Sequence, residues 1–278
     1  MIRTMITATN TMNQLQKNLD VIGNNLANTN THGFKAKHAS FQELLYNQFQ
    51  NDQADLAPRQ SPQGIRYGTG AKIAQIQMTS KLGSLQQTDR QLDFALTTPQ
   101  QYFNVLMPTD GGQEVVYTRQ GSFYIAPIDN GQLMLVNDDG NPIADVNGNP
   151  IIFNENVQNY TVQSGGTLQV TNADGTINTF ELGITSIERP NFMEHLSGTY
   201  IGLPRNMADL GVTEAEVLTN LQGADRNVIG LQNGVLENSN VNFEKEMTDL
   251  INMQRNYQFN ARSVTMADQM LGLINGIR

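Results

Sequence analysis

The chain has 278 residues, of which 38% are hydrophobic and 15% are charged, both below the averages for globular domains. No stretch approaches the ~18 consecutive apolar residues of a membrane-spanning helix, and the absence of cysteine excludes disulfides, thiolate metal sites and thiol catalysis. The net charge of −9 argues against a general nucleic-acid-binding protein, because such binding relies on basic surfaces.

The acidic charge is concentrated in the middle of the chain. Residues 101–200 contain eleven acidic and two basic side chains, a net charge of −9, whereas the remaining residues contain fifteen of each sign. An acidic exterior favours solubility over self-association, while neutral ends can pack against copies of themselves without long-range repulsion. We therefore expect the ends and the middle to be different structural parts.

The first predicted element is a long helix over residues 3–28. Its apolar residues recur at spacings of three and four, the pattern of a helix that packs along one narrow seam. Such a helix is about 40 Å long, and Asn28, Asn30 and Gly33 are residues that commonly end a helix. The seam positions here are Met5, Ala8, Met12, Leu15, Leu19, Ile22 and Leu26.

The same segment lacks the pattern of a cleaved secretory signal. Arg3 is followed by Thr9, Asn10 and Asn13, which interrupt the apolar core of about 7–15 residues that such a signal needs. If the protein leaves the cytoplasm, we expect a route that needs no cleaved signal.

Residues 36–75 have an intermediate character. A short amphipathic stretch around Phe41 and Tyr46 is followed by polar residues with Pro58, Pro62 and Gly64. This composition predicts an extended linker or arm that needs a partner to become ordered.

Residues 76–235 are predicted to form an all-β domain. Apolar and polar residues alternate over short stretches, for example at Leu168 and Val170, and two-residue turn signals separate them. This spacing is typical of short antiparallel strands in a sandwich or barrel. The turn signals are Asn130–Gly131, Asp139–Gly140, Asn147–Gly148, Gly165–Gly166 and Asp174–Gly175.

A second long helix is predicted from about Asn242 to Asn275, some 50 Å in length. Asn240 or Asn242 can cap its start, and apolar residues seven positions apart extend its seam toward the C-terminus. The seam positions in this part of the chain are Leu236, Phe243, Leu250, Tyr257, Val264 and Leu271.

Together these elements predict an α+β fold. Segments 1–35 and 236–278 would form a discontinuous helical domain of coiled-coil-like helices, with 36–75 as a linker or arm and 76–235 as an inserted β domain. Each apolar stripe could cover an ordinary core. However, both stripes are narrow and lie near the ends of the chain, so we expect them to form an assembly seam that other subunits complete.

No motif in the sequence indicates catalytic, cofactor-binding or metal-binding residues. A calcium loop beginning at Asp145 fails, because Pro150 replaces the required glycine and Asn156 the required glutamate. The three histidines have no zinc-site spacing, and no nucleophile elbow is present. Sequence spacing leaves a glycosidase-type pair among the 26 acidic residues open.

Several segments carry a more specific resemblance. The segment 24–35 (NNLANTNTHGFK) resembles the N-terminal signature of bacterial flagellar axial proteins of the rod and hook family, and segments 236–241, 254–257 and 268–271 are similar to its C-terminal signature. Segments 84–95 and 118–123 also resemble the family, whereas 97–103 (TTPQQYF) departs from its usual Gly-x-Gly-Phe-Phe turn. The motif positions are Asn24, Asn25, Asn28, Gly33, Phe34, Lys35, Ser239, Asn240, Arg255 and Asp268.

The resemblance implies a structural, non-enzymatic subunit of the flagellar basal-body rod. Residues 41–46 and 67–70 are most similar to distal-rod proteins, which polymerise helically into the tubular shaft that transmits torque. It further implies contacts with copies of itself and with other rod and hook subunits, and export from the cytoplasm through the flagellar export apparatus without a cleaved signal. The terminal helices would form the inner tube and the β domain the outer layer.

Three alternatives remain. A short hook or proximal-rod subunit would share the same signatures. A secreted β-rich hydrolase with a coiled-coil stem would need converging carboxylates in the β domain. A trimeric surface adhesin would place the β domain at one end of a continuous helix.

Overall fold

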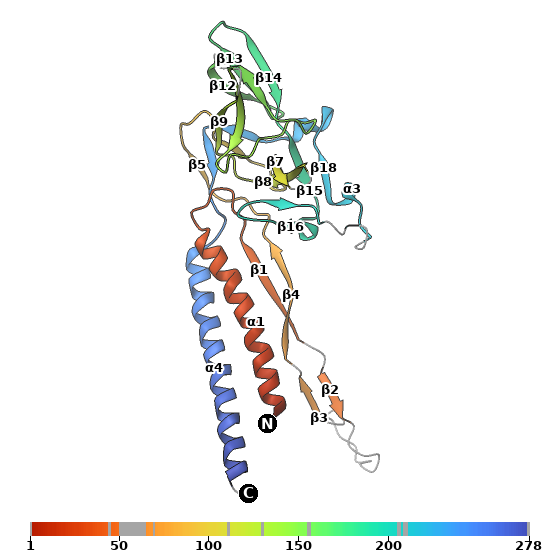
Figure 1. Ribbon diagram of the computed structural model, residues 1–278, viewed down its shortest axis with the longest axis vertical. Helices are drawn as coiled ribbons and strands as arrows, with labels where there is room; N and C mark the ends of the chain where they lie inside the picture. The colour runs from red at the N-terminus through yellow and green to blue at the C-terminus, as the bar shows by residue number, and fades with distance from the viewer. Residues whose placement is uncertain are drawn as a thin grey trace. The chain divides into compact units, whose positions relative to one another are not determined.

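The computed structural model describes residues 2–43, 46–49, 65–68, 70–109, 112–128, 131–154, 157–204, 207 and 211–276. Long helices occupy the two ends of the described chain and strands dominate its middle (Figure 1). The α+β class expected from the sequence is therefore confirmed.

The chain divides into two compact units. Unit 1 comprises Met1–Ala27, Lys37–Gln77 and Asn242–Arg278, and unit 2 comprises Asn28–Ala36 and Met78–Val241. This division differs from the expected segments, since residues 28–36 and 236–241 group with the β-rich unit and residues 37–77 with the helices. Both short connecting segments make their hydrogen bonds inside unit 2, through Gly33, Ala36 and Asn240.

Unit 1 is built around a hairpin of two helices. Helices α1 (Ile2–Ala27) and α4 (Phe243–Gly276) pack side by side and antiparallel, so that the start of α1 and the end of α4 lie at the same end of this unit (Figure 1). The bounds of both helices are close to the predicted ones.

Asn242 determines where α4 begins. Its side-chain Oδ1 accepts a hydrogen bond from the backbone N–H of Lys245 at 3.0 Å, which satisfies one of the donors that a helix start leaves without a partner. Glu244 and Glu246 in the first turn add a favourable interaction with the helix dipole. Of the two cap candidates, Asn242 is the one that caps.

The rest of unit 1 consists of paired strands. Strand β1 (Lys37–Glu43) pairs with β4 (Ala71–Met78), and β2 (Tyr46–Phe49) pairs with β3 (Ile65–Gly68). Helix α1 contacts β1. The described parts of the expected arm are thus extended, as predicted, but paired with each other. Pro58, Pro62 and Gly64 lie outside the described residues.

The described residues of unit 2 form one six-stranded sheet and several smaller ones. The strand order of the large sheet is β16-β17-β8-β7-β15-β18, and three-stranded sheets have the orders β11-β10-β9 and β12-β13-β14. Strands β19 and β6 form one pair, and β20 and β5 form another. The bounds are β5 Leu85–Gln87, β6 Phe94–Leu96, β7 Gln101–Thr109, β8 Gly112–Thr118, β9 Phe123–Ile128, β10 Gln132–Asn137, β11 Ile152–Asn154, β12 Val157–Gln163, β13 Thr167–Asn172, β14 Ile177–Glu181, β15 Ile184–Ile187, β16 Glu194–His195, β17 Ile201–Gly202, β18 Leu218–Asn220, β19 Leu231–Asn233 and β20 Val235–Glu237. Short helical turns occupy η1 Pro190–Phe192, α3 Glu214–Val217 and η2 Gly223–Val228.

The predicted alternation decides which side chains enter the core of unit 2. Leu168 and Val170 on β13 are buried while their neighbours are half-exposed, because successive side chains of a strand point to opposite faces. The rings of Phe94, Phe103 and Phe123 form the centre of the main core. The Asp174–Gly175 turn links β13 to β14 with Gly175 at φ +77°, as the turn signal predicted.

Candidate assembly interface

The seam residues of α1 lie on its covered face. Ala8, Leu15 and Ile22 are buried, and the other predicted positions, Met5, Met12, Leu19 and Leu26, are half-buried. Because α1 packs against α4 and β1 within the same unit, the chain itself covers much of this stripe.

The predicted seam of α4 is only partly present on the helix. Leu250, Tyr257, Val264 and Leu271 are half-buried and form an inner stripe on the face that packs on α1. Phe243 is exposed at the first residue of the helix. Leu236 lies outside the helix altogether, in strand β20 of unit 2, where it pairs with Gln86. The seven-residue spacing from Leu236 to Phe243 is therefore coincidental, because the first residue lies in a strand and the second in a helix. The prediction that Leu236 belongs to the seam of α4 is wrong.

An outer stripe on α4 was missed by the sequence reasoning. It consists of Phe259, Met266, Met270 and Leu273, all exposed, with exposed fractions of 71% for Phe259 and 69% for Leu273. At about 100° per residue, Phe259, Met266 and Leu273 each lie about 200° around the helix from an inner-stripe residue two positions earlier. Their own seven-residue spacing could have revealed them.

The exposed outer stripe has a clear physical consequence. A soluble protein rarely leaves a long row of large apolar side chains in water without a partner. Each fully buried residue of this kind contributes about 1.5–3 kcal/mol, so four of them along one helix provide a substantial driving force for association.

The motif residues of unit 1 differ in their surroundings. Asn25 is fully buried, and its side-chain amide both donates to the carbonyl of Lys37 at 2.7 Å and accepts from its N–H at 2.9 Å. The Asn25 amide thus makes the same two hydrogen bonds to Lys37 that a neighbouring strand would make. These bonds hold the start of β1 against α1. Asn24, Arg255 and Asp268 are exposed.

A buried ion triad lies in unit 2 and consists of Lys35, Arg119 and Glu237. Lys35 Nζ is 2.5 Å from Glu237 Oε1, and Arg119 Nη2 is 2.7 Å from Glu237 Oε2, with all three side chains almost completely buried. The triad joins three parts of the sequence, since 202 residues separate Lys35 from Glu237. It escaped prediction because sequence spacing carries no information about contacts between such distant residues.

Every nitrogen of the Arg119 guanidinium donates a hydrogen bond. Nε donates to Glu237, Nη1 donates to the carbonyls of Thr98 and Gln101, and Nη2 donates to the carbonyl of Leu96. These four hydrogen bonds, together with the ion pair between Nη2 and Glu237, compensate the burial of a group that has five N–H donors. Such a network stabilises only when it is complete.

The surroundings of Lys35 disfavour the charged form of its side chain. Burial and the nearby positive charge of Arg119 lower the pKa of Lys35 to about 8, against the opposing attraction of Glu237. Its ammonium group also donates to the carbonyl of Lys81 at 2.8 Å. Lys35, which belongs to the N-terminal motif, therefore donates hydrogen bonds to Lys81 and Glu237, which lie near the two ends of the segment Met78–Val241 of unit 2.

The remaining motif residues shape the same region of unit 2. Asn240 accepts from the N–H of Ala36 and donates to the carbonyls of Thr79 and Lys81. Gly33 has φ +71°, and a Cβ there would lie 2.5 Å from the backbone nitrogen of Gln120, so only glycine fits.

Two further motif residues form local turns. The Asn28 Oδ1 accepts from the Thr31 hydroxyl at 3.1 Å, and the Ser239 hydroxyl accepts from the N–H of Val241 at 3.4 Å. Phe34 is buried. The signature in unit 2 is thus explained by backbone geometry and hydrogen bonding.

The rejected calcium loop has a structural role. Asp145 Oδ1 accepts from the N–H groups of Asn147 and Asn149, both at 2.8 Å, which is the hydrogen bonding of an Asx turn. Across the residues that the structure describes, no group of three or more metal-ligating side chains comes together. No helix in the described parts of the chain is long and apolar enough to cross a membrane.

Comparison with known proteins identifies the family. The family described as "Flagella basal body rod protein" matches residues 5–35, "Flagellar hook protein FlgE/F/G D1 domain" matches residues 99–170, and "Flagellar basal body rod FlgEFG protein C-terminal" matches residues 232–277. The flagellar hook-basal body complex protein FlhP of Bacillus subtilis is 40% identical, with 100% of each chain covered.

The chain belongs to the flagellar rod and hook protein family. The basal-body rod protein FlgG of Borreliella burgdorferi is 33% identical over 100% of this chain and 99% of its own length. FlgG of Bacillus subtilis is 29% identical over 98% and 97%.

Membership in this rod and hook family places the protein in the flagellar basal body as a structural component. Its family implies assembly with other flagellar rod and hook subunits. The matched regions 5–35 and 232–277 include most of α1, all of α4, the Asn25 anchor and both Lys35 and Glu237.

Proposed function

We propose that this chain is a distal-rod type subunit that polymerises helically, through its terminal helices, into the torque-transmitting tubular shaft of the flagellum. The outer stripe of α4 carries the proposal, because it is an exposed apolar row on a protein of the rod and hook family. Relatives named FlgG that match nearly the whole chain support the rod assignment.

In this proposal the two stripes of α4 have different tasks. The inner stripe holds α4 on α1 within one subunit in a coiled-coil-like hairpin, and the outer stripe packs against a neighbouring copy. Interdigitated helices are close-packed and nearly incompressible, so a tube built from them transmits torque with little deformation. The inserted β domain forms the outer layer, and its acidic charge faces outward.

The same proposal includes export through the flagellar apparatus without a cleaved signal. The helices of unit 1 bury their apolar residues only partly, so separating them costs less than separating a full core. This property suits a chain that crosses a narrow channel before it assembles.

A short hook or proximal-rod subunit, at another position within the hook-basal body complex, is the second candidate. The 40% identity to a protein named as a hook-basal body complex component favours it. The sites of the two candidates differ along the flagellar axis, so labelling of the protein in isolated hook-basal bodies, viewed by electron microscopy, distinguishes them.

Substitution on the outer stripe tests the proposed polymerisation. The double variant Phe259→Asp/Leu273→Asp places two charges in the stripe, and we expect export of the chain to continue while rod assembly and motility are lost. Motility plates, electron microscopy of basal bodies and measurement of exported protein check this outcome.

The matched control is Gln258→Asp/Thr265→Asp, which adds the same charge at exposed positions on the flank of the same helix. We expect this control to assemble. Normal rods from the Phe259/Leu273 variant would contradict an interface on this stripe.

A further inference from the structure

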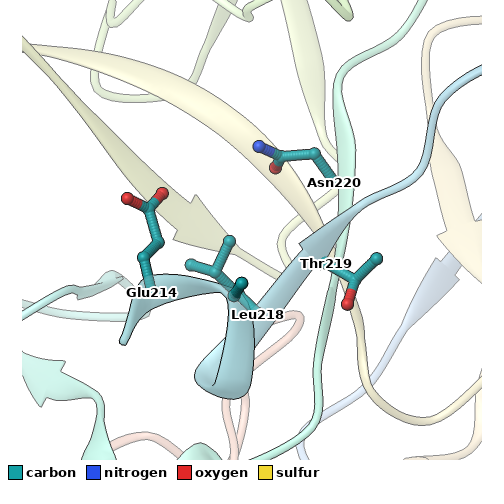
Figure 2. A pocket seen from close by; sticks show the side chains of 5 residues that line it. Glu214, Leu218, Thr219 and Asn220 are labelled. Atoms are coloured by element: carbon teal, nitrogen blue, oxygen red, sulfur yellow. The ribbon is translucent and has the colours of Figure 1, made fainter. Parts of the chain in front are cut away.

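A polar groove in unit 2 has no role in the architecture described above. It has a volume of about 550 Å³ and is lined by residues of β7, β8 and β18, among them Asn104, Glu114, Tyr117 and Asn220, together with Glu214 of α3. A smaller hollow of about 370 Å³ shares Glu214 and Asn220 with it. Figure 2 shows the side chains of Glu214 and Asn220 reaching toward the same open space, with Leu218 between them.

Two buried side chains present polar atoms in this groove without a partner. Asn104 and Tyr117 lie directly opposite each other on β7 and β8 and are only 9% and 4% exposed. The Thr185 hydroxyl lies 2.8 Å from the Asn104 Oδ1 and 2.7 Å from the Asn220 Oδ1, and its single proton serves one of them at a time. Neither the Asn104 Nδ2 nor the Tyr117 hydroxyl has a hydrogen-bond partner among the described residues. Neither atom is among the fully enclosed side-chain atoms that lack a partner, so both are open to the groove and can donate to a bound acceptor.

The groove also contains two carboxylates. Within the part of the chain that the structure describes, neither Glu114 nor Glu214 forms an ion pair, and no basic residue lines the groove. Val115, Leu203 and the buried Leu218 provide an apolar surface beside them. The site therefore combines an apolar floor, two negative charges and two hydrogen-bond donors.

This combination matches one class of occupant. Lysine and arginine have a long apolar stem and a cationic head, which suit the floor and the carboxylates, and the carbonyls of the peptide that presents them can accept from Asn104 and Tyr117. A simple metal ion would leave the apolar floor and both donors unused.

We infer that the groove binds a lysine- or arginine-bearing segment of a second copy of this chain. The inference rests on the proposed polymerisation, in which each subunit meets other copies. The chain has suitable cations to offer, since Arg255 and Arg262 are exposed on α4 and neither forms an ion pair among the described residues. The block 101–200, which contains most of the groove, carries eleven acidic and only two basic side chains.

A peptide titration of the complete chain tests the site itself. The probe is acetyl-Gly-Arg-Gly-amide, with the neutral citrulline peptide as its isosteric control, and the readout is the NMR signals of the Asn104 and Asn220 side-chain amides. We expect these signals to shift and saturate at roughly 1–30 mM arginine peptide, and to remain unchanged with citrulline. Absence of shifts, equal shifts with citrulline, or shifts confined to other regions would overturn the inference.

Matched variants link the binding to the carboxylates. Glu114→Gln/Glu214→Gln should weaken binding of the arginine peptide at least fivefold. The control Asp174→Asn/Glu194→Gln makes the same change in charge at exposed positions outside the groove, and it should leave binding unchanged. Dispersed spectra of both variants establish that the unit remains folded. Equal binding by all three chains would also overturn the site.

The identity of the occupant is tested in cells. Glu114→Lys/Glu214→Lys should reduce the number of assembled rods at least tenfold while export continues, and Asp174→Lys/Glu194→Lys should assemble normally. Normal assembly of the Glu114/Glu214 chain, despite peptide binding in solution, would overturn a second copy as the occupant. That result would leave the proposed polymerisation intact, because the outer-stripe variants test it separately.

Discussion

At the scale of single residues, Glu237 does the most to hold unit 2 together. Its carboxylate accepts hydrogen bonds from Lys35, Arg119 and the N–H of Gly83. Both cations are buried, so each depends on this one carboxylate to compensate its charge. The identity of this residue matters because buried charge without compensation is among the most destabilising features a fold can contain.

We expect Glu237→Gln to lower the free energy of unfolding of unit 2 by about 3–5 kcal/mol. The amide keeps the shape of the side chain but leaves Lys35 and Arg119 as two like charges without an anion. Urea unfolding followed by a probe of the β-rich unit measures the effect. As a control, Glu181→Gln changes a carboxylate that is 53% exposed and 3.9 Å from Arg226. This change should lower the free energy of unfolding by less than about 1 kcal/mol. Equal losses of unfolding free energy from the two variants would contradict the role of the triad.

Two buried tyrosines make stability fall at high pH. Burial raises the pKa of both Tyr102 and Tyr117 from 10.0 to about 12. Between these values the unfolded chain loses its phenolic protons while the folded chain keeps them, so the tyrosine contribution is complete below pH 10 and is lost as the pH rises toward about 12. Lys35 acts in the opposite direction between about pH 8 and 10.5, because its pKa is lowered.

We therefore expect Tyr102→Phe/Tyr117→Phe to unfold at a urea concentration that depends less on pH between 10.5 and 11.5 than in the unsubstituted chain. Tyrosinate absorbance during an alkaline titration gives an independent measure, since these two rings should ionise after the exposed ones. An unchanged pH dependence in the double variant would show that ionisation of these two phenols does not cause the loss of stability.

At the scale of elements, α4 is a helix with two apolar faces and a defined start. A single seam was expected, but a helix that packs on α1 along one face and exposes Phe259, Met266 and Leu273 on the other is suited to bridging two neighbours. Asn242 determines its first turn through the bond to Lys245. The start of the helix is thus specified locally, whereas the use of its two faces depends on what packs against them.

Replacement of the cap should have a modest, local effect. We expect Asn242→Ala to lower the free energy of unfolding by about 1 kcal/mol and to fray the first turn of α4. The fraying should appear as faster amide hydrogen exchange at residues 244–246. Asn252→Ala, at an exposed position within the same helix, should be neutral or slightly stabilising because alanine favours helices. Equal losses from both changes would contradict the capping assignment.

At the scale of the whole molecule, the two units differ in how completely they bury their apolar residues. The core of unit 2 contains many side chains with almost no exposure, such as Phe94, Phe103 and Phe123. In unit 1 most seam residues are only half-buried and the outer stripe is exposed. Regions with fewer buried apolar contacts open more readily, so the units should differ in stability before assembly.

In a dilute monomer we expect the amides of α1 and α4 to exchange at least 100-fold faster than those of β7 and β8. A difference of about 2.7 kcal/mol in opening free energy corresponds to this ratio. Hydrogen exchange followed by mass spectrometry measures both sets in one sample. Equal protection of the helices and the core strands would contradict an unfilled assembly surface on unit 1.

The amino-acid sequence alone determined the helical ends, the β-rich middle, the cap candidate Asn242, the turn at Gly175 and the family signature. These features depend on periodicity and on residues close together in the chain, which local sequence records. Only the tertiary structure decided that Leu236 belongs to a strand, that Phe259 and Leu273 form the exposed face of α4, and that Lys35, Arg119 and Glu237 meet. Burial and ion pairing depend on which surfaces and charges the fold brings together, and no spacing pattern encodes a contact between residues 202 positions apart.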